Sequence, residues 1–307
     1  ASGDPQGALG YYDKVVASRP DIADVQMKRG TLLLQAGKLP AARRALDEIL
    51  AHDAGHVGAR WALGEIDLRE GNLKSARGRA DGLLKDHPEH PAGYSLKGDL
   101  QMQEKNYSAA SVSYRKASEL SPRRVFLTKT ASALKADGQD QASLDVIKAW
   151  LEDRPQDVTA RMSYATQLQT MGREDEAVTE YRKLMQTQPD NPVVLNNLAW
   201  LYHQQGDQDQ ARDLARRAYE KAPQLAGVID TYGWILVNSG DTDRGLSLLK
   251  EAVEKGRGQG DIRYHLAAAY AKAGNKAKAR SELEDLLADQ TAFAERAEAE
   301  KLLESLR

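Results

Sequence analysis

The stretch PVVLNNLAWLYHQQGDQDQARDLARRAYEKAPQL (residues 192–225) and the stretch that follows it, AGVIDTYGWILVNSGDTDRGLSLLKEAVEKGRGQ (226–259), share one pattern. In both, a turn glycine falls at the same place, and these two glycines are 34 residues apart. The register extends in both directions, with Lys105 filling one slot and glycine the others: Gly37, Gly71, Gly138, Gly172, Gly206, Gly240 and Gly274. A fixed period of this length indicates an array of structural repeats.

Two sets of small residues keep the same register. One set precedes the turn slots: Gly30, Gly64, Gly98, Ala131, Ala165, Ala199, Gly233 and Ala267. The other set follows them: Ala8, Ala42, Ala76, Ala110, Ser143, Ala177, Ala211, Gly245 and Ala279. Larger apolar residues surround both sets at helical spacing. The pattern therefore predicts pairs of antiparallel helices that approach closely at the small residues, joined by a turn in which glycine takes a positive φ.

A proline closes most of the units. It comes 17 residues after the turn slot: Pro20, Pro88, Pro122, Pro155, Pro189 and Pro223. Proline cannot continue a helix, so these positions predict the end of each second helix. One helix pair cannot bury its apolar face alone, so neighbouring pairs are expected to stack. The predicted fold class is all-α.

This arrangement resembles the tetratricopeptide repeat over nearly the whole chain. The resemblance implies a right-handed α-solenoid with eight repeats over residues 23–293, near 23–56, 57–90, 91–123, 124–157, 158–191, 192–225, 226–259 and 260–293. Residues 1–22 begin at a turn with Gly3, and we expect them to supply only the second helix of a partial repeat, as in a piece of a longer array. Residues 294–307 are expected to form a C-terminal capping helix. Ala54 and Arg257 replace the closing proline in two repeats.

Composition points away from several functions. The formal net charge is −2 and 29% of residues are charged, so no general attraction for nucleic acid is predicted. There are no cysteines, and no apolar stretch is long enough to span a membrane, so membrane attachment would need an anchor or partner outside this sequence.

The sequence also lacks the motifs of a catalytic or metal site. Walker-type loops, a nucleophile elbow and the HExxH motif are all missing. Histidine pairs at 52 and 56 and at 87 and 90 have no aligned carboxylate or cysteine, so we interpret them as polar residues at repeat junctions. The chain is therefore predicted to be non-enzymatic, with no cofactor and no metal.

The resemblance also implies where a partner would bind. In tetratricopeptide arrays the second, fifth, ninth and twelfth positions of each first helix line a concave groove. Here these positions hold the predicted partner-binding residues Trp61, Glu65, Asp99, Met102, Met162, Asn196, Trp200, His203, Asp230, Trp234 and Tyr264. Aromatic planes beside amide and carboxylate groups suit a peptide, an extended loop or a sugar chain. Packing between repeats is the alternative role for the tryptophans, and a carboxylate clamp is disfavoured because Asn196 alone fits one.

The last third of the chain has a finer resemblance. It contains LNNLAWLYHQQGD (195–207), DTYGWILVNSGD (230–241) and DIRYHLAAAYAKAGNKAKAR (261–280). This succession is similar to bacterial tetratricopeptide proteins of exopolysaccharide and exosortase (PEP-CTERM) systems, of the PrsT type. The resemblance implies a periplasmic scaffold that associates with the outer membrane, whose protein partners modify or export polysaccharide, with a glycan as a further ligand. The alternative is a general adaptor or co-chaperone-like module with another protein partner, in the cytoplasm or elsewhere.

Overall fold

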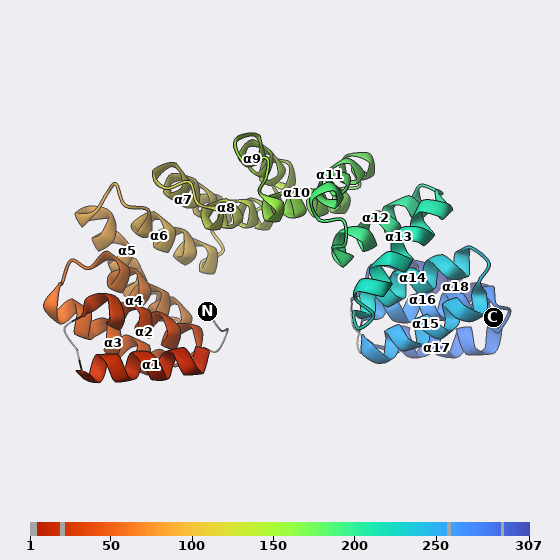
Figure 1. Ribbon diagram of the computed structural model, residues 1–307, viewed down its shortest axis with the longest axis horizontal. Coiled ribbons are helices and arrows are strands. Elements are labelled where there is room, and N and C mark those ends of the chain that lie inside the picture. Colours follow the sequence, from red (N-terminus) through yellow and green to blue (C-terminus); the bar gives the residue numbers. More distant parts are fainter. Residues whose placement is uncertain (1–4, 19–21, 257–258, 290–291) are drawn as a thin grey trace. The chain divides into compact units, whose positions relative to one another are not determined.

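The computed structural model describes residues 5–18, 22–256, 259–289 and 292–307, and Figure 1 shows their arrangement into helices. Throughout these ranges the regular secondary structure is α-helix, in eighteen helices, with no strand. This confirms the prediction of an all-α helical repeat solenoid. Gly3, Pro20 and Arg257, which the sequence pattern singled out, lie outside the described residues.

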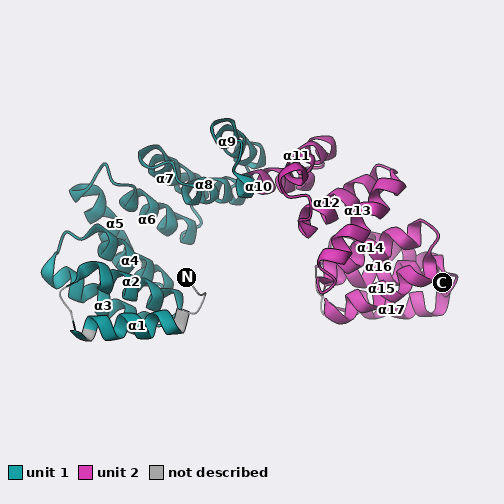
Figure 2. Cartoon of the chain, viewed as in Figure 1, with its two compact units in different colours: residues 1–160 teal, residues 161–307 magenta. Residues whose placement is uncertain are grey.

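The helices fall into two compact units, residues 1–160 and 161–307, which Figure 2 colours separately. Unit 1 contains α1 (Pro5–Ser18), α2 (Ala23–Gln35), α3 (Leu39–His52), α4 (Val57–Arg69), α5 (Leu73–Asp86), α6 (Pro91–Gln103), α7 (Tyr107–Leu120), α8 (Arg124–Ala136) and α9 (Asp140–Asp153). The boundary between the units lies within α10 (Val158–Thr170).

Unit 2 continues with α11 (Glu174–Thr187), α12 (Pro192–Gln204), α13 (Gln208–Lys221), α14 (Ala226–Asn238), α15 (Thr242–Lys255), α16 (Gly260–Lys272), α17 (Lys276–Ala288) and α18 (Arg296–Ser305). The last helix, α18, packs on both α16 and α17. The limits of the partial repeat, the eight repeats and the capping segment stay predictions. Within the described residues no helix combines the length and apolar character that a membrane crossing requires.

The turns inside the helix pairs have the predicted backbone. All seven turn glycines have positive φ, between 71° at Gly37 and 92° at Gly240. Lys105 takes the same conformation with φ 60°, and no other described residue except glycine has a positive φ. In unit 2, the amide of Asp207, just after Gly206, donates to the carbonyl of Tyr202, which closes the end of the first helix.

The small residues lie where the helices come closest. A Cβ on Gly98 of α6 would overlap the ring of Tyr114 in α7, and one on Gly64 of α4 would overlap Leu96 in α6. In unit 2, a Cβ on Gly245 of α15 would lie 2.7 Å from the carbonyl oxygen of Gly233 in α14. The predicted close approach of paired helices is therefore confirmed for α6 with α7 and for α14 with α15, whereas the contact of Gly64 joins first helices of successive repeats.

The two helices of each pair have different neighbours. Several first helices of successive repeats contact one another: α4 contacts α2 and α6 in unit 1, and α14 contacts α12 and α16 in unit 2. Second helices contact the first helices on either side, and in the described part of the chain none approaches another second helix comparably. The first helices therefore form the inner layer of each stack, and all of the predicted partner-binding positions lie on these helices.

Candidate functional site

Four aromatic rings meet on the first helices of unit 2. Trp200 comes from α12, Trp234 from α14, and Tyr264 and His265 from α16; we call this set the aromatic cluster. His265 lies at its centre, with its ring centroid 4.7 Å from that of Trp234 and 5.7 Å from that of Trp200. Tyr264 completes the set at 6.0 Å from His265. Both tryptophans and Tyr264 are half-buried, so part of each ring remains accessible to a partner.

His265 is held in place from the preceding repeat. Its Nδ1 lies 2.8 Å and 3.0 Å from the two carboxylate oxygens of Asp230 in α14. Both residues are buried, with 5% and 6% of their surface exposed. Burial alone lowers the pKa of His265, but the hydrogen bond and charge of Asp230 outweigh it and raise that pKa above its ordinary value. Burial in turn raises the pKa of Asp230, so the pair retains a proton to higher pH than either group would in water.

Asp230 therefore supports the cluster through its bond to His265. It was predicted as a groove residue, but its carboxylate is buried and bonded to His265. His203 of α12 lies at the edge, with its ring centroid 6.0 Å from that of Trp200 and its Nδ1 3.1 Å from Oε1 of Gln208. Lys272 of α16 places its ammonium 5.2 Å from the ring centroid of Trp234. The cluster thus presents aromatic surface with a cation at one side.

Asn196 offers an unused hydrogen-bond acceptor one turn before Trp200. It is half-buried, and its side-chain oxygen Oδ1 is shielded from solvent with no hydrogen-bond partner among the described residues. A buried acceptor left unpaired is unfavourable by about 1–3 kcal/mol, and a ligand could reach this oxygen only if the surrounding side chains moved.

A pair of carboxyl groups lies near the cluster. Glu295, which precedes α18, shares a hydrogen bond with Asp261 at the start of α16, and the amide of Ala294 donates to Asp261 at 2.9 Å. Burial and the neighbouring Asp261 raise the pKa of Glu295 to about 7. Burial and the charges of Glu298 and Glu295 also raise the pKa of Tyr264. Proton uptake here is therefore linked to the contact between α16 and the segment before α18.

Three more of the predicted partner-binding residues, Trp61, Glu65 and Asp99, lie on first helices of unit 1. Asp99 of α6 accepts hydrogen bonds from Lys129 of α8 at 2.7 Å and from the hydroxyl of Tyr114 at 2.8 Å. Burial raises the pKa of Glu65 in α4, and the nearby Asp99 adds to this shift. Trp61 of α4 is half-buried and lines a pocket between α4, α6 and α8. Asp99, like Asp230, uses its carboxylate to bind a basic residue of the next repeat.

The two methionines among the predicted partner-binding residues, Met102 and Met162, are not part of the aromatic cluster. Met102 packs against the buried residues Ala110, Tyr114 and Ala133. Met162 is half-buried on α10 in unit 2.

Sequence reasoning missed His265 and Lys129, although a signal was present. Each is the sixth residue of its first helix, and each binds an acidic residue of the preceding repeat. A basic residue at this position, with an acid about one period earlier, would have indicated both pairs. In these two repeats the sixth residue therefore faces the preceding first helix.

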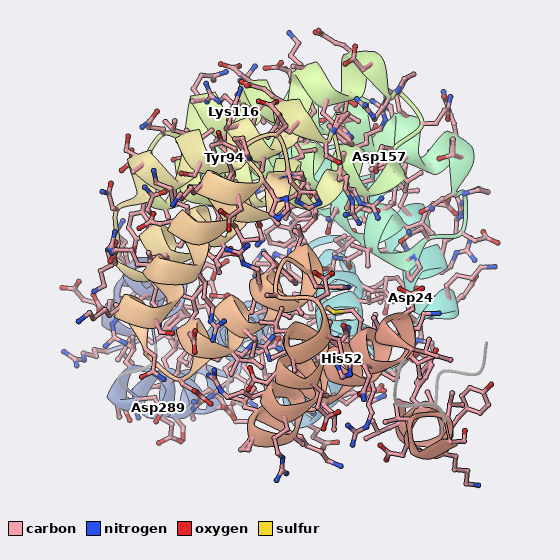
Figure 3. All side chains as sticks on the ribbon, turned by 90° about the vertical axis from the view of Figure 1, so that its left-hand side faces the viewer. Asp24, His52, Tyr94, Lys116, Asp157 and Asp289 are labelled. Atoms are coloured by element: carbon pink, nitrogen blue, oxygen red, sulfur yellow. The ribbon has the colours of Figure 1, made fainter. Side chains whose placement is uncertain are left out.

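The histidines at repeat junctions contact backbone groups that are close to them in the sequence. His56 and His90 cap α4 and α6 by accepting backbone amide hydrogens from Ala59 and Ala92. His52, labelled in Figure 3, lies exposed at the end of α3, with Nδ1 2.9 Å from the carbonyl oxygen of Glu48. Across the described ranges, no three histidine or acidic residues are grouped so that they could hold a metal ion.

Comparison with known proteins identifies the repeats. No curated protein matches the sequence. The chain is similar to one chain of the APC/C hetero-tetramer Cut9-Hcn1, with 14% identity and a TM-score of 0.58, over 98% of this chain and 59% of that chain. It thus spans less than two thirds of that neighbour's length. It is also similar to a tetratricopeptide repeat protein from Parabacteroides merdae ATCC 43184, with 17% identity and a TM-score of 0.52, over 80% of this chain and 98% of that chain.

At these identities the structural likeness shows the fold alone. The sequence itself is matched by family models described as tetratricopeptide repeat, over residues 1–57, 33–100, 92–124, 156–224 and 236–306. These matches together cover most of the chain and coincide with the helix pairs described above, so the chain belongs to the tetratricopeptide repeat family.

Proposed function

We propose that this chain is a non-enzymatic scaffold that holds an extended segment of a partner protein against the first helices of unit 2. Tetratricopeptide repeat proteins typically mediate protein–protein interactions, and the family supports a binding role rather than catalysis. The observation that carries the proposal is the aromatic cluster, in which Trp200 and Trp234 occupy the same position of successive repeats and are both partly accessible.

The cluster has the properties of a binding hot spot. Large aromatic side chains provide much contact area with few rotatable bonds. Rings that are already fixed in the free protein lose little further conformational entropy when a partner binds. Here His265 fixes the ring of Trp234 by stacking, and Asp230 fixes His265.

A finer role follows from the resemblance of the last third to exopolysaccharide-associated repeat proteins. In that role the scaffold lies in the bacterial periplasm, is held at the outer membrane by an anchor or partner, and gathers proteins that modify or export polysaccharide. A glycan chain is a second candidate ligand, because sugar rings also stack on indole planes. A general adaptor in the cytoplasm or envelope is the competing function.

The test is affinity capture of the full-length protein from its native cells, followed by mass spectrometry. The double variant Trp200→Ala and Trp234→Ala is expected to lose the main partner while circular dichroism shows unchanged helix content. Trp150→Ala is the matched control, because this half-buried tryptophan lies on a second helix of unit 1. Capture of polysaccharide-modifying or export proteins would support the finer role, and other specific partners would support the general adaptor. Equal capture by the double variant and the wild type would reject the site.

A further inference from the structure

A pocket of about 420 Å³ opens on the inner layer of unit 1, between the first turns of α4, α6 and α8. It forms because two successive first helices carry small residues there: Gly58 at the second position of α4, and Ala92 and Ser95 at the second and fifth positions of α6. Larger side chains, Trp61 and Phe126, stand on either side. Its volume lies at the lower end of the roughly 300–1,000 Å³ that ligand sites occupy, which suits one large side chain and its backbone.

The walls of the pocket are mostly apolar. Val57 and Trp61 come from α4, Ala92 from α6, and Val125 and Phe126 from α8. Val125 is 46% exposed at the mouth, an unusual position for a large aliphatic residue in the described chain. An apolar side chain of a partner would cover this surface and remove it from water, which is favourable by about 25 cal/mol for each Å² buried.

The charged groups at the mouth are unequally paired. The ammonium of Lys129 is neutralised by Asp99 at 2.7 Å and also donates to Ser95 at 3.3 Å. Arg124, beside the mouth, pairs with Asp157 at 3.2 Å. Arg123 lines both the pocket and the adjoining hollow over α8, is exposed, and has no hydrogen-bond or ion-pair partner for its guanidinium within the described ranges. The mouth therefore carries one uncompensated positive charge beside an apolar interior.

We propose that this pocket receives an aromatic or large aliphatic side chain of a partner polypeptide, flanked in sequence by an aspartate or glutamate that pairs with Arg123. This inference rests on the proposed function and specifies the chemistry of one partner segment: acidic around a hydrophobic anchor. Arginine suits the acidic neighbour because its planar guanidinium can bind a carboxylate through two parallel hydrogen bonds.

Three fluorescein-labelled pentapeptides test the chemistry by fluorescence anisotropy with the full chain. The first has a central phenylalanine with two glutamates on each side. The second replaces the glutamates by lysines, and the third replaces the phenylalanine by glycine. The acidic phenylalanine peptide is expected to bind at or below about 1 mM, at least about tenfold more tightly than the other two. Its affinity should fall as salt is added, because the pair with Arg123 is near solvent.

Variants of the chain locate the binding. Arg123→Glu and Ala92→Phe are each expected to weaken binding of the acidic phenylalanine peptide by at least about tenfold, the first by reversing the charge and the second by filling the pocket. Arg115→Glu on α7 is the matched control, because it makes the same charge change at an exposed arginine outside the pocket. Circular dichroism should show all three variants folded.

Three results would overturn the proposal: no binding at about 1 mM, equal binding of the lysine peptide, or equal weakening by Arg115→Glu. None of these variants alters Trp200 or Trp234. If the pentapeptides fail to bind while partner capture still depends on those tryptophans, the pocket assignment fails and the proposed function stands.

Discussion

The imidazole of His265 is stacked on the indole of Trp234, with their ring centroids 4.7 Å apart and their planes inclined by 16°. The two residues come from successive first helices, α16 and α14, so the stack joins two repeats. Asp230, on the same helix as Trp234, binds the imidazole edge at 2.8 Å. A stacking contact and an ion pair between the same two helices therefore fix the accessible tryptophan to the body of unit 2.

His265→Phe is expected to destabilise unit 2 by about 3–5 kcal/mol, because it keeps an aromatic ring but leaves the buried carboxylate of Asp230 without its partner. The measurement is urea unfolding followed by tryptophan fluorescence. It is made in a background with Trp61→Phe and Trp150→Phe, so that the signal comes from the two tryptophans of unit 2.

A second variant separates the ion pair from the packing. The double change Asp230→Leu with His265→Phe removes both polar partners and is expected to recover most of the lost stability. If the double variant were as unstable as His265→Phe alone, the buried carboxylate would not be the cause.

The stability of unit 2 should fall as pH rises from about 4.5 to about 7. Glu295 has a folded-state pKa of about 7, against an ordinary value of 4.5, so in this window the folded state holds a proton that the unfolded state releases. His265 adds a decrease of the same sign above its ordinary value of 6.5, since its pKa is also raised. Burial also raises the pKa of Asp230 above its ordinary value of 3.8, so this carboxyl group adds a decrease of the same sign above pH 3.8.

Glu295→Gln isolates the carboxyl contribution. The amide keeps hydrogen-bonding capacity toward Asp261 but cannot titrate, so the decrease between about pH 4.5 and 7 should become smaller, and the part due to Asp230 and His265 should remain. Urea unfolding at several pH values measures this. An unchanged profile in the variant would show that Glu295 is not the titrating group.

The parts of the fold that could be predicted from the sequence are those that recur in every repeat. A positive φ at the turn favours glycine, and closely packed helices favour small residues, so both residue types recur in the sequence at nearly every period. The division into two units near residue 160 could not be predicted in this way, because the spacing of the repeat positions continues unchanged through α10.

The candidate site was only partly predictable for a related reason. Trp200 and Trp234 share one repeat position and were found by it, and both are partly accessible on the first helices. His265 occurs in one repeat only, and its role depends on an acid about one period earlier in the chain. The pocket near Trp61 depends on side-chain sizes in three repeats together, which no single residue indicates.

Gly245→Ala is expected to destabilise unit 2 by about 1–3 kcal/mol, because the new Cβ would lie 2.7 Å from the carbonyl oxygen of Gly233 and force α14 and α15 apart. Gly78→Ala on α5 is the contrasting change. Nothing lies within 4 Å of its added Cβ, so alanine there should stabilise the helix by about 0.5–1 kcal/mol. Thermal unfolding of both variants tests whether Gly245→Ala lowers the stability and Gly78→Ala raises it. A neutral effect at Gly245 would mean that the two helices can separate without loss.

Lys105→Gly is expected to stabilise unit 1 by about 1 kcal/mol. Lys105 occupies the turn between α6 and α7 with φ 60°, a left-handed conformation that costs an L-residue other than glycine about 1–2 kcal/mol. Glycine removes this strain but gains flexibility in the unfolded chain, which offsets part of the benefit. Lys105→Ala removes the same charge and keeps the Cβ, so it should give no increase. Urea unfolding of the three proteins, followed by circular dichroism, measures the difference; equal stabilisation by alanine and glycine would trace the effect to the lysine charge instead of the backbone.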